Sequence, residues 1–335
     1  MSRAALVAAI GAASLTAAGP AGATIVFEKS PFRPTVWSAA DDGSARVQLT
    51  SGELPRISPD GTLVAYETPY RGNTRPTLRV IPAAGGDSRL LLKPVWYSFG
   101  FSPDSKTIAA VTGKEVGRKR LVLVDVATGA VRTVAHGQFS GFSFSPDGTM
   151  LVFARAPKDA YPPRSDLLVA PVAGGLPTVM TSNHRSVSPV WGPAGIAFAR
   201  LRKPPRRGDA YKQDIYVLDP ATKLARRITT TKVPFLLSGL DPVAWSADGT
   251  RLLAEFGGQD TSYAETVDPA TGAVRRAGRR SDGIVGYDLS ADGSTILATT
   301  GGYDPGDRHD VVTVPYGGGT PTVLVENAFS PGWTR

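Results

Sequence analysis

The sequence predicts an all-β fold, a seven-bladed β-propeller, from a turn motif that recurs along most of the 335-residue chain. A tetrad of the type Ser-Pro-Asp-Gly returns at steps of 40 to 54 residues, about the length of one four-stranded blade. A second, Gly-rich turn follows each copy between two short apolar runs. The chain also has 37 Gly and 28 Pro, which disfavours long helices. The copies begin at Ser58, Ser102, Ser145, Gly192, Ser246, Ser290 and Ser330, the last one truncated to Ser330-Pro331-Gly332.

Residues 1–23 have the pattern of a secretory signal peptide. Arg3 precedes the apolar run Ala4–Ala18, and Ala21-Gly22-Ala23 fits the small-x-small cleavage rule. The alternative, a membrane anchor, is disfavoured because about 15 apolar residues fall short of the ~20 that span a bilayer. We therefore expect cleavage near Ala23, a secreted or periplasmic protein without a transmembrane segment, and a single propeller domain over residues 24–335.

The tetrad has the chemistry of a tight hairpin. Pro presets φ for the first turn position, Asp accepts hydrogen bonds from nearby backbone N–H groups, and Gly takes the position with positive φ. If the strands of a blade are named a to d from the axis outward, this turn joins a to b, and the Gly-rich turn joins c to d. The recurring aspartate, for example Asp60, is predicted to be a turn residue and not a calcium ligand or a catalytic acid.

The residues before each tetrad alternate in size with period two, as in a β-strand. The residue immediately before the tetrad is always large and apolar, and the one before that is mostly small. We expect the large residues to fill the space between blades and not to form a ligand platform. They are Ile57, Phe101, Phe144, Trp191, Trp245, Leu289 and Phe329.

The two ends of the propeller domain are predicted to form one composite blade. Residues 24–50 supply strands b, c and d without an a strand, and residues 326–335 supply an a strand alone. Pairing of these pieces closes the ring and removes free sheet edges. With six continuous blades, the composite blade makes seven.

The Ser-Pro-Asp-Gly repeats resemble the WD40-like (PD40) repeats of TolB-type β-propellers, and similar propellers are N-terminal domains of prolyl-oligopeptidase-family enzymes. This resemblance implies a periplasmic or secreted protein that binds other envelope components. The usual propeller of the family has six blades, so a six-bladed ring is the alternative fold. TolB also carries an α/β domain ahead of its propeller, for which we expect no room after Ala23, so the resemblance does not extend to membership of a Tol–Pal complex.

A catalytic role has little support in the sequence. The chain has no Cys and three His, and it lacks the Gly-x-Ser-x-Gly elbow of an oligopeptidase-type hydrolase. We therefore expect a monomeric, non-catalytic binding or scaffold module. The alternative function is a calcium-dependent small-molecule hydrolase or lactonase with its site in the axial channel.

The long b-to-c loops share one face of a propeller and carry many basic residues and tyrosines, in a chain with a net charge of +8. We expect this face to dock an envelope protein or an anionic cell-wall polymer. The alternative is a solvated basic rim, and nucleic acid is disfavoured by the export signal. The predicted contact residues are Tyr70, Arg71, Arg75, Tyr161, Arg202, Lys203, Arg206, Arg207, Tyr211 and Tyr303.

Three charged residues interrupt the small positions of the a strands at neighbouring blades: Arg56, Asp288 and Glu326. They are predicted to line the axial channel as a structural ion cluster, because buried charges are normally paired. The alternative is that they are the polar contacts of a small ligand. With Asp241 near the same end, a Ca²⁺ ion held by Asp241, Asp288 and Glu326 is a further hypothesis, and no other cofactor is expected.

Overall fold

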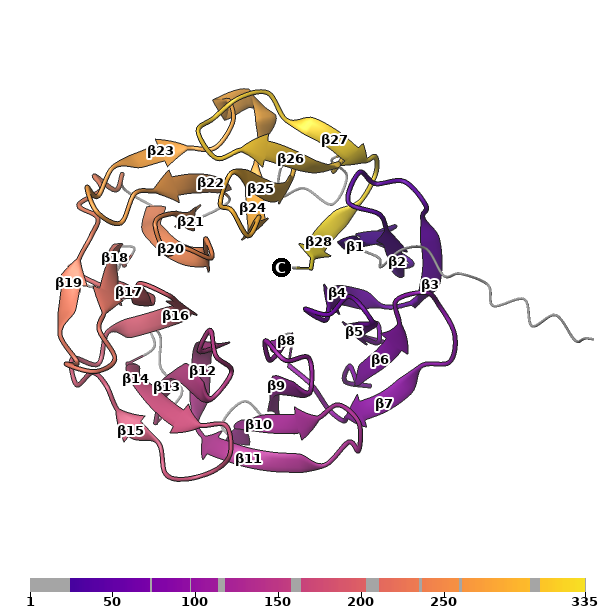
Figure 1. The fold of residues 1–335 in the computed structure, drawn as a ribbon, viewed down its shortest axis with the longest axis horizontal. Coiled ribbons are helices and arrows are strands. Elements are labelled where there is room, and N and C mark those ends of the chain that lie inside the picture. Colours follow the sequence, from indigo (N-terminus) through magenta and orange to yellow (C-terminus); the bar gives the residue numbers. More distant parts are fainter. Residues whose placement is uncertain are drawn as a thin grey trace, which may run out of the picture.

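The chain forms a ring of four-stranded blades around a central axis (Figure 1). The structure, a computed structural model, describes residues 25–72, 74–96, 98–113, 118–157, 164–202, 211–234, 237–258, 261–301 and 308–334. The strands follow the ring once in sequence order, so that β28 returns to β1 (Figure 1). No helix in the described ranges is long and apolar enough to cross a membrane.

Every blade is ordered from its innermost strand outward, and neighbouring strands within it are antiparallel. The first blade consists of β28 (Phe329–Trp333), β1 (Ile25–Lys29), β2 (Thr35–Ala39) and β3 (Val47–Ser51), and the second of β4 (Glu53–Ile57), β5 (Leu63–Glu67), β6 (Leu78–Pro82) and β7 (Arg89–Leu92). The third blade consists of β8 (Phe99–Phe101), β9 (Thr107–Thr112), β10 (Arg120–Asp125) and β11 (Val131–His136). The fourth consists of β12 (Gln138–Phe144), β13 (Met150–Ala156), β14 (Asp166–Pro171) and β15 (Thr178–Val179).

The next two blades belong to one eight-stranded sheet. A single parallel residue pair, Gln213 with Gly239, joins β18 to β20, and the other pairing stays within each group of four. Counting both groups separately, the described strands form seven blades, which confirms the predicted fold. The fifth blade consists of β16 (Ser186–Gly192), β17 (Gly195–Leu201), β18 (Gln213–Leu218) and β19 (Ala225–Arg227), and the sixth of β20 (Leu237–Trp245), β21 (Leu252–Gly258), β22 (Thr261–Val267) and β23 (Val274–Arg276). The 3-10 turn η2 (Arg280–Asp282) leads to the seventh blade, which consists of β24 (Val285–Leu289), β25 (Thr295–Thr299), β26 (Val311–Pro315) and β27 (Thr322–Val325).

The ring closes through the composite blade, as predicted. Strand β28 pairs antiparallel with β1, and Ile25 lies opposite Trp333 and Val26 opposite Gly332. Strands β1, β2 and β3 supply the b, c and d positions, and the C-terminal strand supplies the a position at the axis (Figure 1). Residues at the two ends of the chain thereby share one sheet and leave no unpaired inner edge there.

The tetrad turns have the predicted hairpin chemistry. In the first copy, Ser58 Oγ donates to Asp60 Oδ1 at 2.5 Å and accepts from Leu63 N at 2.9 Å, and Asp60 Oδ1 also accepts from Thr62 N at 3.0 Å. Gly61 has φ 72°. The same serine-to-aspartate bond, at 2.5 to 2.6 Å, recurs in four more copies: Ser102–Asp104, Ser145–Asp147, Ser246–Asp248 and Ser290–Asp292. The recurring aspartates are therefore structural turn residues, as predicted.

The prediction that Ser330-Pro331-Gly332 forms the last tetrad turn is wrong. These residues lie inside strand β28 and do not form an a-to-b turn. Trp333 pairs with Ile25 as Ile57 pairs with Val64, so Trp333, and not Phe329, is the large residue that precedes the turn position. The misassignment arose because a Ser-Pro pair also occurs inside an a strand, at Ser188-Pro189 in β16, and Ser188 and Ser330 share a φ near 50°.

The hydrophobic core is divided into seven clusters, one between each pair of neighbouring blades. The cluster that closes the ring joins Ile25 and Phe27 of β1 to Leu297 of β25 and Val311 of β26, all of which are fully buried. Each large residue before a turn lies in or against one cluster, with Trp333 in the place predicted for Phe329. The prediction that this set packs between blades is confirmed for the other six.

Candidate functional site

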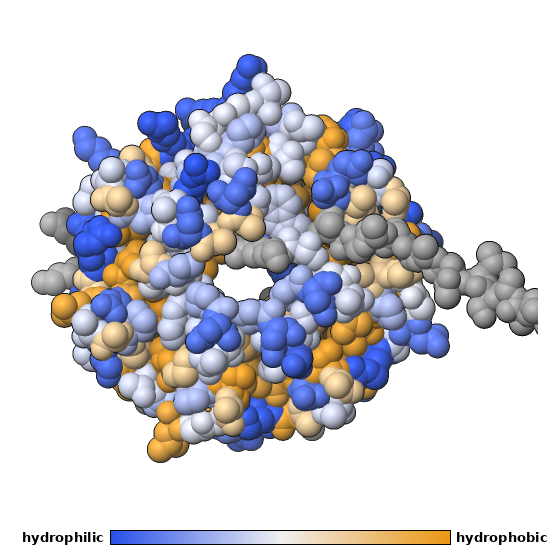
Figure 2. Space-filling model, viewed as in Figure 1, coloured by the Kyte–Doolittle hydropathy of each residue, from blue (hydrophilic) through white to orange (hydrophobic). Residues whose placement is uncertain are grey.

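The seven a strands enclose an axial channel, which is open at the centre of the ring (Figure 2). Its cavity has a volume of about 770 Å³ and receives residues from β28, β4, β8, β12, β16, β20 and β24. At one mouth it is lined by prolines of the tetrad turns, such as Pro59 and Pro103. The cavity is large enough for a small molecule, in the size range of ordinary ligand sites.

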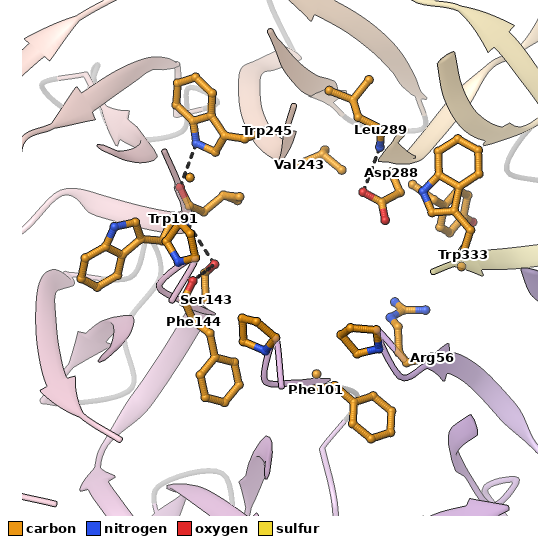
Figure 3. A pocket seen from close by; sticks show the side chains of 18 of the residues that line it. Arg56, Phe101, Ser143, Phe144, Trp191, Val243, Trp245, Asp288, Leu289 and Trp333 are labelled. Carbon is orange, nitrogen blue, oxygen red and sulfur yellow. Dashed lines mark hydrogen bonds between the residues drawn. The ribbon is translucent and has the colours of Figure 1, made fainter. Parts of the chain in front are cut away.

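The side chains of the a strands divide into two sets (Figure 3). The rings of Phe101, Phe144, Trp191 and Trp245 point away from the axis, toward the spaces between blades. Trp245 Nε1 donates to Val190 O at 3.2 Å and so ties two neighbouring a strands together. The side chains of the second set face the channel and are mostly small, and they determine the polarity of the cavity.

Arg56 and Asp288 line the channel and point into it (Figure 3). Arg56 Nη1 donates to the carbonyl oxygen of the preceding Pro55 at 2.9 Å, and Asp288 Oδ1 accepts from Leu289 N at 2.8 Å. Arg56 forms no ion pair with any residue in the described ranges. Its guanidinium is therefore not part of the structural ion cluster that the sequence predicted.

Glu326 does not line the channel, which corrects the prediction. It lies between β27 and β28, its side chain is 67% exposed, and Oε2 accepts an ion pair from Arg308 at 3.1 Å. The error follows from the misplaced last tetrad: with Trp333 in the aligned position, Gly332 is the residue that corresponds to Arg56 and Asp288. Glu326 is outside the a strand altogether.

Asp241 lies in β20 but is not among the residues that line the cavity. Gln213 Nε2 donates to its Oδ2, and burial raises the pKa of Asp241 to about 6. No group of three or more Asp, Glu or His residues in the described part of the chain is arranged to hold a metal ion. The proposed calcium ligands Asp241, Asp288 and Glu326 are therefore not brought together.

Two buried acidic residues, Glu28 and Glu67, act electrostatically on Arg56. Glu28 of β1 is 3% exposed and accepts hydrogen bonds from Leu54 N and from the Ser330 hydroxyl. Burial raises the pKa of Glu28 to about 7, and these hydrogen bonds oppose the shift. Burial also lowers the pKa of Arg56, while Tyr287, Glu28 and Glu67 act on it in the opposite direction. Sequence reasoning did not identify Glu28, although the same position of the b strand holds Glu67 in β5 and Glu255 in β21.

The b-to-c loops lie on one face of the ring, as expected from the strand order. Six residues from the β5–β6 loop, the β7–β8 connection and the β9–β10 loop are together called the Trp96 corner: Tyr70, Arg71, Arg75, Trp96, Arg118 and Lys119. Arg75 Cζ and Lys119 Nζ each lie 4.3 Å from the centre of the Trp96 ring, and Trp96 Nε1 donates to Gly113 O at 2.6 Å. Tyr70 and Arg71 are exposed.

Trp96 was missed in the sequence, although a signal was present. Three of the five tryptophans precede a turn position or its equivalent, and Trp37 lies in strand β2. Trp96 is the remaining one and lies in a connection between blades, where a large aromatic residue has no repeat function. That position distinguishes it from the tryptophans that precede a turn, although its ring also packs against one of the core clusters.

Arg202 has a structural partner, although it was predicted as a contact residue. Its Nε and Nη2 donate to the two oxygens of the buried Asp214, each at 2.8 Å, and Arg227 also pairs with Asp214 at 2.8 Å. Tyr211 is half-buried. The other predicted contact residues lie outside the described residues, as does the predicted signal peptide at residues 1–23: Tyr161, Lys203, Arg206, Arg207 and Tyr303.

Comparison with known proteins supports the fold. No protein-family model matches the chain, and no curated protein matches it. The solved structures that resemble it include TolB from Acinetobacter baumannii, with a TM-score of 0.55 and 16% identity over 92% of this chain and 82% of that one. The β-propeller domain of the Trilobed protease from Pyrococcus furiosus has a TM-score of 0.67 and 15% identity over 91% and 93% of the two chains.

An oligogalacturonate lyase in complex with manganese is also similar, with a TM-score of 0.59 and 16% identity over 91% of this chain and 86% of that one. Structures at this level of identity share the fold, and function depends on sites placed on the fold. The chain therefore has a TolB-like propeller fold, and its WD40-like (PD40) assignment stays a prediction.

Proposed function

We propose that the protein is a non-catalytic binding module of the cell envelope, secreted or periplasmic after cleavage near Ala23, that docks an anionic partner through the Trp96 corner. The observation that carries this proposal is the concentration of cations around one tryptophan on the loop face. Arg75 and Lys119 both lie against the Trp96 ring, and the exposed Arg71 is on the same loop as Arg75.

The Trp96 corner differs from the other basic loops in how its charges are used. Arg71, Arg75 and Lys119 form no ion pair with a described residue, whereas Arg202 is held by Asp214. Contact with an aromatic ring limits the freedom of the Arg75 and Lys119 side chains without neutralising their charge. Fixed, uncompensated cations beside an aromatic surface attract anionic groups and lose less entropy when they bind them.

The partner is an acidic envelope protein or an anionic surface polymer, and the protein itself is a monomer.

A triple variant, Arg71→Ser, Arg75→Ser and Lys119→Ser, tests the site on immobilised heparin and polygalacturonate as model polyanions. We expect it to elute at lower salt than wild type, because screening weakens the remaining exposed charges. The matched control removes three exposed cations elsewhere in the ring, with Lys106→Ser, Lys223→Ser and Arg226→Ser, and is expected to elute close to wild type. Equal shifts for the two triple variants would show that only net charge matters and would contradict a localised site.

The alternative function, a calcium-dependent hydrolase or lactonase with a site in the axial channel, needs a set of oxygen ligands around one ion. The described residues provide no such set, and the predicted ligands lie in separate places. The alternative thus stays a prediction from the sequence without a structural argument in its favour. Metal analysis of the purified protein tests it, since one tightly held Ca²⁺ per chain would favour the enzyme.

A further inference from the structure

Phe32 is a large apolar side chain that the protein holds in solvent on the loop face. It lies in the connection between β1 and β2, and it is 85% exposed. Tyr70, in the β5–β6 loop of the neighbouring blade, is 54% exposed. Within the described part of the chain, the large apolar residues exposed on the loop face are Phe32 and Tyr70. The others that are exposed lie in outer strands or in c-to-d turns: Leu90, Val131, Leu176, Val179, Leu224 and Val323.

The connection that carries Phe32 has a fixed shape. Ser30 has φ 65°, and its hydroxyl accepts a hydrogen bond from Arg33 N at 3.4 Å. Pro31 and Pro34 restrict the backbone on either side of Phe32, and the Pro34 carbonyl accepts from the backbone N–H between β3 and β4 at 3.0 Å. A single exposed apolar residue is common on a protein surface. A ring fixed at the tip of a constrained loop, however, loses little entropy when it enters an apolar medium.

The exposed charges around Phe32 and Tyr70 have one sign. In the described loops, connections and strand ends on this face of the first three blades, the exposed Lys, Arg, Asp and Glu residues are all cations. The acids in the same segments are buried or half-buried: Glu28, Glu53 and Glu67. The apolar tips thus lie in a basic sector of the loop face. Its exposed cations are Arg33, Arg71, Lys93, Arg118 and Arg120.

The shape of this surface favours one kind of partner. Phe32 and Tyr70 belong to separate loops, so a folded protein would need a matching pocket for each ring. A lipid bilayer has no fixed shape and accepts separate tips. Aromatic rings are stable at the level of the headgroups, and lysine and arginine are attracted to anionic headgroups. An anionic bilayer therefore matches both the apolar tips and the cations around them.

We propose that the protein binds the surface of an anionic lipid bilayer through the loop face of its first two blades, with Phe32 inserted at the level of the headgroups. Tyr70 lies at the interface in this arrangement, and Arg33 and Arg71 contact anionic headgroups. The a-to-b turns, on the opposite face, point away from the bilayer. The association is peripheral and reversible, because one aromatic ring and a few cations bind far less strongly than a membrane-spanning helix. The proposal goes beyond the docking function of the Trp96 corner and does not depend on it, since Phe32 lies outside that corner.

Sedimentation with lipid vesicles tests the proposal. The form that lacks residues 1–23 is used, because the apolar run Ala4–Ala18 would itself bind lipid. We expect binding to mixed phosphatidylcholine and phosphatidylglycerol vesicles, and at least tenfold weaker binding to phosphatidylcholine alone. Phe32→Ser should weaken binding to the mixed vesicles at least tenfold. The matched control is Leu176→Ser, which removes a 90% exposed apolar residue from a c-to-d turn and should stay within twofold of wild type. Equal losses for the two variants, or no binding of wild type to the mixed vesicles, would overturn the proposal.

Phe32→Trp distinguishes insertion from attraction between charges alone. Tryptophan keeps an aromatic ring at the tip, and its fluorescence should be quenched by lipids with brominated acyl chains more strongly than that of the five tryptophans of wild type. Quenching no greater than in wild type would show that the cations alone hold the protein at the surface, and would overturn the proposal. Phe32→Ser should keep wild-type retention on immobilised heparin, so this site and the Trp96 corner are tested separately. Wild-type vesicle binding by folded Phe32→Ser, as expected if a partner protein is what binds Phe32, would also overturn the proposal.

Discussion

The carboxylates at the a-to-b turns and the carboxyl group of Glu28, buried in the b strand β1, have opposite character. At the a-to-b turns, aspartates recur from blade to blade and accept hydrogen bonds from the serine and threonine of their own turn, which lowers the pKa of Asp248 and Asp292 to about 2. Near the loop end, Glu28 lies in its b strand at the position that Glu67 and Glu255 hold in β5 and β21, and burial raises the pKa of Glu28 to about 7. A turn carboxylate whose hydrogen bonds lower its pKa thus stabilises the fold when it is ionised, whereas a buried carboxyl with a raised pKa stabilises the fold when it is protonated.

Of the variants that test this difference, Glu28→Gln is expected to change the free energy of unfolding most. The pKa of Glu28 is raised from 4.5 to about 7 in the folded protein, so the folded state holds the proton more tightly than the unfolded state. The resulting stabilisation is fully present below pH 4.5 and is lost as the pH rises through 7. The shift corresponds to about 3 kcal/mol, an upper value because other groups relax. Glutamine stays neutral, so the variant should be more stable than wild type at pH 8 and similar to it at pH 4.5.

Urea unfolding at several pH values between 4.5 and 8 measures this difference. Glu326→Gln is the control, because Glu326 is exposed and its neutralisation should leave the slope with pH unchanged. If wild type and Glu28→Gln lose stability in parallel as the pH rises, Glu28 is not the buried acid that the structure indicates.

Ser58→Ala tests the a-to-b turn and is expected to lower the free energy of unfolding by about 1–3 kcal/mol. Ser58 is fully buried, and its hydroxyl both donates to Asp60 and accepts from Leu63 N. Alanine leaves that buried N–H without its acceptor. Thermal or urea unfolding at pH 7 measures the loss, with Ser281→Ala, at an exposed site, as the control. A loss no larger than that of the control would mean that the turn serine does not hold the hairpin.

The sequence predicted the fold because the constraint on each turn repeats. The residue types found at Ser58, Asp60 and Gly61 recur with the same spacing in other blades, so the turns and the strands beside them could be placed from the sequence. The error at Ser330 had a physical origin, since Ser-Pro occurs inside an a strand as well as in the a-to-b turn, so that this short motif has two structural uses.

The candidate sites were less predictable, because they depend on residues that do not repeat. Arg56 and Asp288 were found as charged exceptions at small positions, and the structure places both in the channel. Trp96 was missed because its contacts with two loops are three-dimensional facts with no local pattern. Glu28 was missed although Glu67 and Glu255 hold the same b-strand position in two other blades, because the sequence does not show that Glu28 is buried. Exceptions to a repeat can be read from sequence only where the repeat itself defines the position.

Asp248→Asn should have a smaller effect, visible at acid pH. The pKa of Asp248 is lowered from 3.8 to about 2, chiefly by the hydrogen bond from Ser246, so its stabilisation is present above pH 3.8 and is lost as the pH falls through about 2. Asparagine retains an oxygen acceptor but has no charge to lose. The variant should therefore be somewhat less stable than wild type at pH 7, and the two should converge near pH 2. Circular dichroism along an acid titration measures this convergence, and a constant difference down to pH 2 would contradict the assigned pKa.

Arg71→Ser should have the smallest effect on stability, within about 0.5 kcal/mol of wild type, because the side chain is exposed on a loop. Arg71 is exposed and belongs to the proposed docking surface. Its replacement should therefore lower retention on a polyanion column while the melting temperature stays constant. Lys106→Ser, at an exposed turn position on the opposite face, should change neither quantity. A fall in melting temperature without a fall in retention would place Arg71 among the structural residues and remove the Trp96 corner from the proposed docking surface.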